Sequence, residues 1–257
     1  MCEIFGISAN RKVKINELLR IFFSHGIEHP DGWGIAICDD GNVSIEKEPV
    51  KVSKSKYLKS RINSRIASGH TLAHIRKATI GHVEYENTHP FTGKDASGRS
   101  WTLVHNGTIF ESDKLVKYQY EQKGSTDSER ILLYIIDRVN ALLEEELNGF
   151  DVNARVELIE EIAKELSKGN KLNFILSDGE YMYIHKNADG TLYRKQEDGY
   201  AIFSTKPLDN GRWDEISDNT LLVYNNGKLV YTGEKHNHTY VEDLEKINMI
   251  YLAYSGL

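Results

Sequence analysis

The chain has 257 residues, 40% of them hydrophobic, and its 32 Lys and Arg against 38 Asp and Glu give a formal net charge of −6, which is ordinary for a globular protein. A net negative chain without a long basic block argues against nucleic-acid binding through phosphates, and no apolar stretch approaches the ~20 residues that cross a bilayer. Two cysteines, Cys2 and Cys38, are too few for a disulfide scaffold, so we expect a cytoplasmic protein with no nucleic-acid or membrane partner, folded as one domain over residues 1–257.

The first part of the chain alternates between strand and helix patterns. Residues 3–8 are apolar and predict an initial strand that ends before polar residues 10–12. Asn16 is expected to cap a helix with apolar residues at helical spacing, and Gly26 to be its left-handed stop. A buried strand, its hairpin mate and an amphipathic helix with a basic outer face follow at residues 32–38, 43–48 and 53–66.

The rest of the chain predicts two long helices and further strands. The helices begin at Ser125 and Asn153 and end near Val139 and Lys168. Strands are predicted at residues 71–76, 101–105, 172–177, 181–185, 201–204, 221–224 and 228–232. Because several strands are joined by short turns, they must pair antiparallel, which favours sheets covered by helices.

Cys2 carries the sharpest chemical hypothesis. Methionine aminopeptidases remove Met1 when the second residue is small, and removal would leave Cys2 with a free α-amino group. That amine titrates at about 7.7–8.0 and a thiol at about 8.5, so the amine can accept the thiol proton without a histidine. This is the chemistry of N-terminal nucleophile hydrolases, although a small second residue is common and is a weak signal alone.

Five segments in register resemble the class II glutamine amidotransferases, specifically their small stand-alone members. The segments are Met1-Cys2-Glu3-Ile4-Phe5-Gly6, Asp31-Gly32-Trp33-Gly34-Ile35-Ala36, residues 74–81 leading into 87–91, His105-Asn106-Gly107, and Ser125-Thr126-Asp127-Ser128-Glu129. The resemblance covers most of the chain. It implies an α+β fold, a four-layer αββα sandwich with two mainly antiparallel sheets face to face, which the strand and helix order alone does not predict.

The resemblance also implies roles for six residues. Cys2 would attack the γ-amide of glutamine, while Asn106 and Gly107 would stabilise the oxyanion. Taken alone, this Asn-Gly pair favours a plain hairpin turn instead. Arg76, helped by Thr79, would hold the substrate α-carboxylate, since a guanidinium binds a carboxylate with two hydrogen bonds. Asp127 would bind the α-ammonium. A surface salt bridge is the alternative for Arg76, and a helix cap the alternative for Asp127.

Other polar residues are assigned no chemistry. His89 and His105 are expected to support packed loops, because the Cys2 amine already supplies a base. His82, Glu84 and His89 lack a convincing metal spacing, and Gly32-Trp33-Gly34 lacks the third glycine of a dinucleotide fingerprint. We therefore expect neither a metal nor a cofactor, and Cys38 packed as a small hydrophobe.

Two classes of function remain open. The first is an amidohydrolase that forms a thioester on Cys2 and releases ammonia from glutamine, for a separate acceptor protein, or cleaves another γ-glutamyl compound, as resemblance to glutathione-degrading members would allow. In the synthase-linked members a His commonly stands where this chain has Ile80, which leaves the γ-glutamyl substrate open. The alternative is a non-catalytic subunit of a larger complex that binds a γ-glutamyl ligand, with the basic helix at Lys54–Arg65 as a partner surface.

Overall fold

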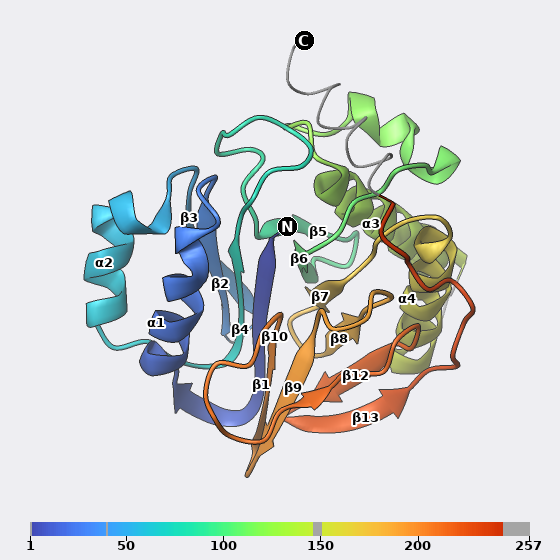
Figure 1. Ribbon diagram of the computed structural model, residues 1–257. Coiled ribbons are helices and arrows are strands. Elements are labelled where there is room, and N and C mark those ends of the chain that lie inside the picture. Colours follow the sequence, from blue (N-terminus) through green and yellow to red (C-terminus); the bar gives the residue numbers. More distant parts are fainter. Residues whose placement is uncertain (1, 40, 146–150, 244–257) are drawn as a thin grey trace.

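Two antiparallel sheets lie face to face, with a pair of helices covering the outer side of each (Figure 1). The computed structural model describes residues 2–39, 41–145 and 151–243. The first sheet has seven strands in the order β11-β9-β10-β1-β4-β2-β3, and the second has six in the order β13-β12-β8-β7-β6-β5. This is the predicted αββα sandwich.

The helices of each outer layer are consecutive in the chain. Helices α1 (Asn16–Ser24) and α2 (Lys56–Asn63) cover the first sheet, and α3 (Asp127–Glu145) and α4 (Val152–Ser167) cover the second. The strands of the first sheet are β1 (Glu3–Lys14), β2 (Trp33–Asp39), β3 (Asn42–Glu48), β4 (Ala67–Ile75), β9 (Tyr193–Glu197), β10 (Tyr200–Ser204) and β11 (Asp214–Glu215). Those of the second are β5 (Phe91–Lys94), β6 (Ser100–His105), β7 (Phe174–Ser177), β8 (Met182–His185), β12 (Leu222–Asn225) and β13 (Lys228–Thr232).

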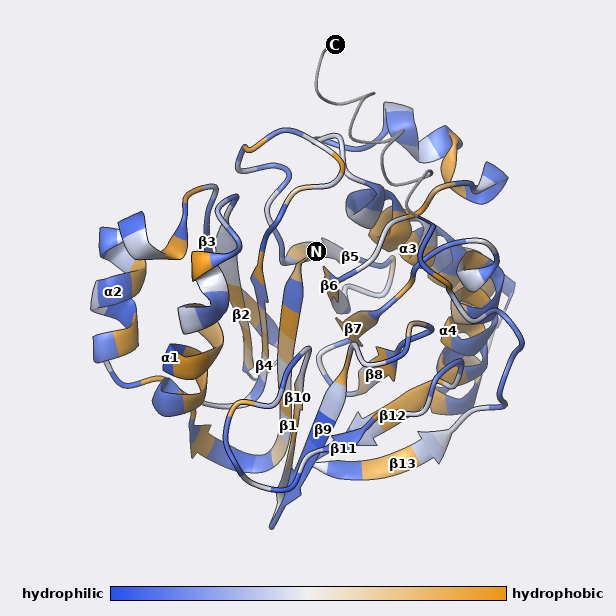
Figure 2. Ribbon diagram, in the orientation of Figure 1, coloured by the Kyte–Doolittle hydropathy of each residue, from blue (hydrophilic) through white to orange (hydrophobic). Residues whose placement is uncertain are grey.

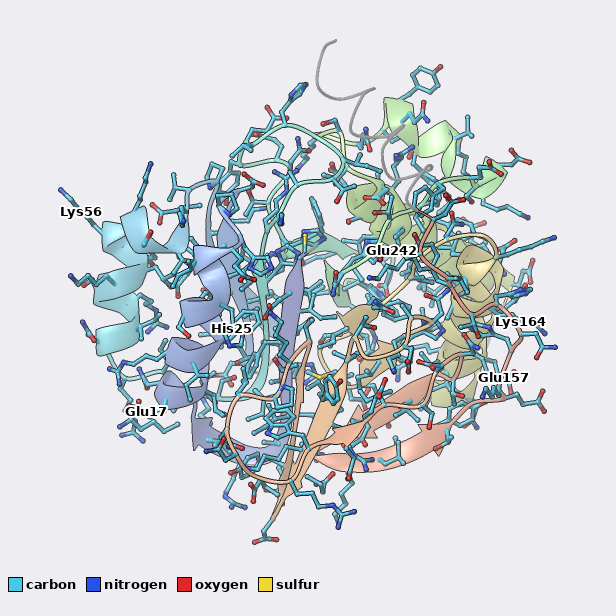
Figure 3. All side chains as sticks on the ribbon, viewed as in Figure 1. Glu17, His25, Lys56, Glu157, Lys164 and Glu242 are labelled. Carbon is cyan, nitrogen blue, oxygen red and sulfur yellow. The ribbon has the colours of Figure 1, made fainter. Side chains whose placement is uncertain are left out.

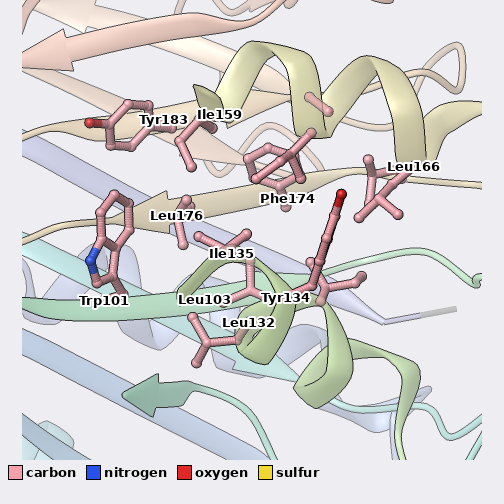
Figure 4. Close-up of a cluster of buried hydrophobic side chains, with 14 of the residues drawn as sticks. Trp101, Leu103, Leu132, Tyr134, Ile135, Ile159, Leu166, Phe174, Leu176 and Tyr183 are labelled. Atoms are coloured by element: carbon pink, nitrogen blue, oxygen red, sulfur yellow. The ribbon is translucent and has the colours of Figure 1, made fainter. Parts of the chain in front are cut away.

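Strand alternation divides the core into three apolar layers. In β1, Phe5 packs towards α1 and α2, whereas Ile4 packs between the sheets. In β6, Trp101 and Leu103 pack against α3 and α4 (Figure 4), and Val104 faces the first sheet. Hydrophobic residues on the helices turn towards the sheets (Figure 2), and the charged residues labelled on α1, α2 and α4 in Figure 3 are exposed. Cys38 packs between the sheets as expected.

Two local predictions around α1 are wrong. Asn16 does not cap this helix: its side chain donates to the carbonyls of Ile62 and Ser64 and accepts from the Ile66 N–H, which fastens α1 to the end of α2. Gly26 is not a left-handed stop but lies in a 3₁₀ turn, where a Cβ would come 2.6 Å from a methyl carbon of Val52. Both residues serve contacts with distant parts of the chain.

The register of the first sheet places Cys2 at the rim of the sandwich. Glu3 pairs with Ile75 and Ile4 with His74, so Cys2 and Arg76 stand opposite one another just beyond the last pair. Because side chains alternate along a strand, both belong to the inter-sheet face. The N label in Figure 1 marks this end of β1, between the two sheets.

Candidate active site

A pocket opens where the ends of β1, β4 and β6 meet the start of α3. Its volume is about 30 Å³. Its lining residues are Cys2, Arg76, Lys77, Ala78, Thr79, Ile80, His89, His105, Gly107, Thr108, Thr126, Asp127 and Ser128. Five of the six residues singled out from the sequence therefore line one pocket, whereas Asn106, the residue before Gly107, is buried and does not line it.

The Cys2 thiol is held against the turn that follows β4. Its Sγ lies 3.4 Å from both the carbonyl oxygen and the backbone nitrogen of Lys77, so it can donate to one and accept from the other. Burial raises the pKa of this thiol, while the Lys77 N–H and the positive charge of Arg76 act in the opposite direction. The thiol is consequently protonated at neutral pH, and nucleophilic attack requires a base to remove its proton.

Arg76 is buried, with its guanidinium directed into the loop that follows. One terminal nitrogen donates to His82 O at 2.9 Å, and the other donates to Ile80 O and Gly81 O at 3.0 Å each. This loop carries Thr79, a half-buried residue of the pocket wall. The surface salt bridge considered for Arg76 is wrong: its partners are backbone carbonyls that fix the pocket rim.

Asp31 is a supporting residue that the sequence motif contained but to which no role was assigned. Its N–H donates to Arg76 O at 3.1 Å, and its carboxylate accepts from the Ala78 N–H at 2.7 Å. Asp31 thus fixes the backbone on both sides of Lys77, the residue that is hydrogen-bonded to Cys2: its N–H holds Arg76 and its carboxylate holds Ala78. An acidic residue before the Gly-Trp-Gly strand was the only signal that could have suggested this.

The segment after β6 is not a hairpin turn. Neither Asn106 nor Gly107 has the positive φ that an Asn-Gly hairpin requires, and the chain continues into a bridge between Thr108 and Lys171. A Cβ at Gly107 would lie 2.1 Å from Lys171 O, so only glycine fits there. The Asn106 side chain is buried, and its Oδ1 has no hydrogen-bond partner among the described residues.

Asp127 begins α3 and also lines the pocket. One carboxylate oxygen accepts from the Ile109 N–H at 2.8 Å, and the other accepts from the Ser128 N–H at 2.9 Å. The Thr126 hydroxyl accepts a hydrogen bond from the Glu129 N–H at 3.3 Å, as the cap of a helix does. Asp127 therefore joins α3 to the segment that follows β6, and its negative charge opposes ionisation of Cys2.

The histidines around the pocket are buried and neutral. The His74 and His89 rings stack with centroids 4.0 Å apart, and His105 Nδ1 lies 2.9 Å from the hydroxyl of Ser128. Burial lowers the pKa of all three below the ordinary histidine value, and the neighbouring positive charge of Arg76 adds to this for His74 and His89. These groups are poor proton acceptors at neutral pH, which fits the supporting role expected of His89 and His105.

One acidic cluster within the described part of the chain has a spacing that could suit a metal ion. Ligand oxygens of Asp189, Glu215 and Asp218 lie within 4.8 Å of one another. The ammonium of buried Lys186 pairs with Glu215 and with Asp218, so a cation of the protein already neutralises two of these three acids. None of these residues lines the Cys2 pocket.

Comparison with known proteins identifies the family. Residues 1–197 match the class-II glutamine amidotransferase family. The chain belongs to this family. An uncharacterized protein of Methanocaldococcus jannaschii is 31% identical over 264 residues, which cover 91% of this chain and 72% of the relative. Among the described residues of this amidotransferase, no helix is long and apolar enough to span a membrane.

Two further relatives of the amidotransferase have named activities or ligands. The gamma-glutamyl-hercynylcysteine sulfoxide hydrolase of Mycolicibacterium smegmatis is 25% identical over 209 residues, which cover 81% of this chain and 83% of that protein. The glutamine phosphoribosylpyrophosphate amidotransferase of B. subtilis, solved with ADP and GMP, superposes with a TM-score of 0.66 at 16% identity. That match covers 91% of this chain but 49% of the solved chain, and it shows the shared fold.

Proposed function

We propose that this amidotransferase hydrolyses the γ-amide of glutamine, or a related γ-glutamyl bond, through a thioester on Cys2. The observation that carries the proposal is the convergence of Cys2, Gly107, Arg76 and Asp127 on one pocket. A thiol, a backbone N–H of a residue that lines the same pocket, a guanidinium and a carboxylate match the reacting amide and the two charged ends of a γ-glutamyl group. The gamma-glutamyl hydrolase relative supports including γ-glutamyl compounds other than glutamine.

In this mechanism the α-amino group of Cys2, freed by removal of Met1, takes the thiol proton. The thiolate attacks the amide carbon, and the Asn106 side-chain amide and the Gly107 N–H stabilise the oxyanion. The amine then donates its proton to the leaving nitrogen, which departs as ammonia or as an amine. Water attacks the thioester with the amine again as base, and glutamate leaves with Cys2 restored.

The charged ends of the substrate fix its orientation. We propose that Arg76 and Thr79 bind the α-carboxylate and that Asp127 binds the α-ammonium. Arg76 already donates to loop carbonyls, so a carboxylate would share or replace those acceptors. The Asp127 carboxylate is fixed by two backbone N–H groups, which leaves it pre-organised as an acceptor at the pocket wall.

The proposed hydrolysis is complete once ammonia is released, so it requires no ammonia-consuming site in this fold. Residues 1–257 are proposed to form one amidotransferase domain, since the described strands and helices all belong to the sandwich. A separate protein partner is the proposed acceptor of the ammonia. No cofactor or metal takes part in the proposed chemistry.

Four compounds test the proposed substrate. We expect release of ammonia from glutamine and of glutamate from γ-glutamyl peptides, but almost no ammonia from N-acetylglutamine, which lacks the ammonium, or from the α-amide of glutamine, which lacks the carboxylate. Coupled ammonia detection compares the three amides at equal concentrations, and coupled glutamate detection follows the γ-glutamyl peptides. Equal rates for glutamine and N-acetylglutamine would contradict the role of Asp127, and no hydrolysis of any γ-glutamyl compound would contradict the function.

The identity of the base gives a pH prediction. The amine accepts a proton only when it is unprotonated, so kcat/KM should rise with pH up to an amine pKa near the ordinary value of about 7.7–8.0, and fall about tenfold per unit well below it. Burial lowers the pKa of His89 and His105, so either histidine as base would leave kcat/KM flat above the ordinary histidine pKa. Rates measured from about pH 5 to 9 distinguish the two.

A further inference from the structure

We propose that Asn173 and Asn187 are positioning residues for the oxyanion site and that they connect it to the C-terminal segment 236–240. This inference rests on the proposed function. The family match ends at residue 197, so the segment at the far end of this connection lies outside the matched region. Both asparagines are fully buried, and neither lines the pocket.

Asn173 makes a reciprocal pair of hydrogen bonds with Asn106. The Asn106 N–H donates to Asn173 O at 2.8 Å, and the Asn173 side-chain amide donates to Asn106 O at 3.1 Å. The second bond fixes the peptide between Asn106 and Gly107, whose nitrogen is the proposed backbone donor to the oxyanion. A rotation of this peptide would turn the Gly107 N–H away from the reacting carbon, so the Asn173 amide acts directly on the donor's orientation.

Asn187 holds Asn173 in turn. Its N–H donates to the Asn173 side-chain oxygen at 3.1 Å, and its own side-chain oxygen accepts from the Leu172 N–H at 2.8 Å. With its oxygen and nitrogen both bonded, the Asn173 amide can adopt only the orientation that donates to Asn106. Buried polar groups satisfied on every side specify one local structure, and loss of one partner leaves the others unpaired.

The C-terminal segment 236–240 is hydrogen-bonded to Asn187 and so extends this network. The Asn187 side chain donates to His238 O at 3.0 Å, and the Tyr240 N–H donates to Asn187 O at 2.7 Å. The Tyr240 ring also stacks on Phe110, with centroids 5.9 Å apart, three residues after Gly107. The segment continues to Glu242, which is labelled in Figure 3. Segment 236–240 is therefore fastened to the oxyanion loop by both backbone and ring contacts.

The test uses Asn→Asp substitutions in the full chain. Asn173→Asp keeps the acceptor for Asn187 but replaces the donor to Asn106 with a carboxylate oxygen, and Asn187→Asp removes the donor to His238. The control is Asn16→Asp, since Asn16 is equally buried and donates to two carbonyls, but lies in the outer layer away from the pocket. All three should lose comparable thermal stability.

Only Asn173→Asp and Asn187→Asp should lose catalytic activity. We expect kcat for glutamine to fall roughly 10- to 100-fold, with the KM for glutamine and the inhibition constant of glutamate changed less than about threefold, because the oxyanion donors act in the transition state. Alkylation of Cys2 by iodoacetamide, which develops no oxyanion, should keep the wild-type rate. If the wild type is active and Asn173→Asp has the same kcat as Asn16→Asp, the inference is overturned and the proposed function stands. An inactive wild type would overturn both.

Discussion

Replacement of Cys2 by alanine is expected to abolish hydrolysis of every γ-glutamyl substrate while the fold and glutamate binding persist. Removal of a covalent nucleophile costs on the order of 10⁴–10⁶ in kcat. Alanine is small enough for Met1 still to be removed, so the α-amino group remains and only the thiol is lost. The measurement is kcat by glutamate release, with glutamate affinity from calorimetry and the fold from circular dichroism.

Cys38→Ala is the matched control for this experiment. Cys38 lies between the sheets, burial raises the pKa of its thiol to about 11, and it is not part of the pocket. The control should cost about 1 kcal/mol of stability or less and leave kcat unchanged. A wild-type protein that binds glutamate without turning over any γ-glutamyl compound, and binds equally after Cys2→Ala, would instead favour the non-catalytic binding subunit.

The second large effect is expected from Asn106→Ala. Loss of one oxyanion donor typically lowers kcat by about 10²–10³-fold and changes substrate affinity little, since the donor acts on charge that develops only in the transition state. Steady-state kinetics with glutamine gives kcat and KM separately. A KM that rises with kcat unchanged would contradict the proposed role and assign Asn106 to substrate binding.

Gly107 is less suitable for the same test. A Cβ at this position would lie 2.1 Å from Lys171 O and 2.4 Å from His105 Nε2, so Gly107→Ala must shift the backbone. Any loss of activity would then combine displacement of Asn106 with loss of the Gly107 N–H from its position. Asn106→Ala removes one buried side chain, whose Oδ1 has no partner within the part of the chain that the structure describes, and therefore reports on the donor more directly.

The sequence predicted the main strands and helices but not how distant parts meet. The apolar residues 3–8 indicated β1, yet the polar residues 10–12 that were expected to end it lie within the strand, because Val13 and Lys14 pair with the start of β4 after a register shift. The short strands β5, β9 and β11 were missed. Strand β9, Tyr193–Glu197, is polar and only partly buried, so it carries no apolar alternation.

Contacts between distant residues account for the site residues that could not be predicted. Arg76 and Cys2 were found because they belong to recognisable motifs, although their position opposite one another depends on the pairing of β1 with β4. Asn173 and Asn187 occur in segments that look like ordinary strand ends. Their importance follows only from burial and from long-range hydrogen bonds. The bond from Asn173 to Asn106 spans 67 residues, and the bond from Asn187 to His238 spans 51.

The central claim is that the α-amino group of Cys2 is the base, and this group exists only after Met1 has been removed, because an amide nitrogen has its lone pair delocalised and cannot accept the thiol proton. Intact mass spectrometry before and after treatment with a glutamine-mimicking diazoketone tests it most directly. We predict that active protein lacks Met1 and gains one adduct, which maps to Cys2, while any molecule that retains Met1 stays unlabelled and inactive. Full activity in protein that retains Met1, or an adduct on Cys38, would contradict the mechanism.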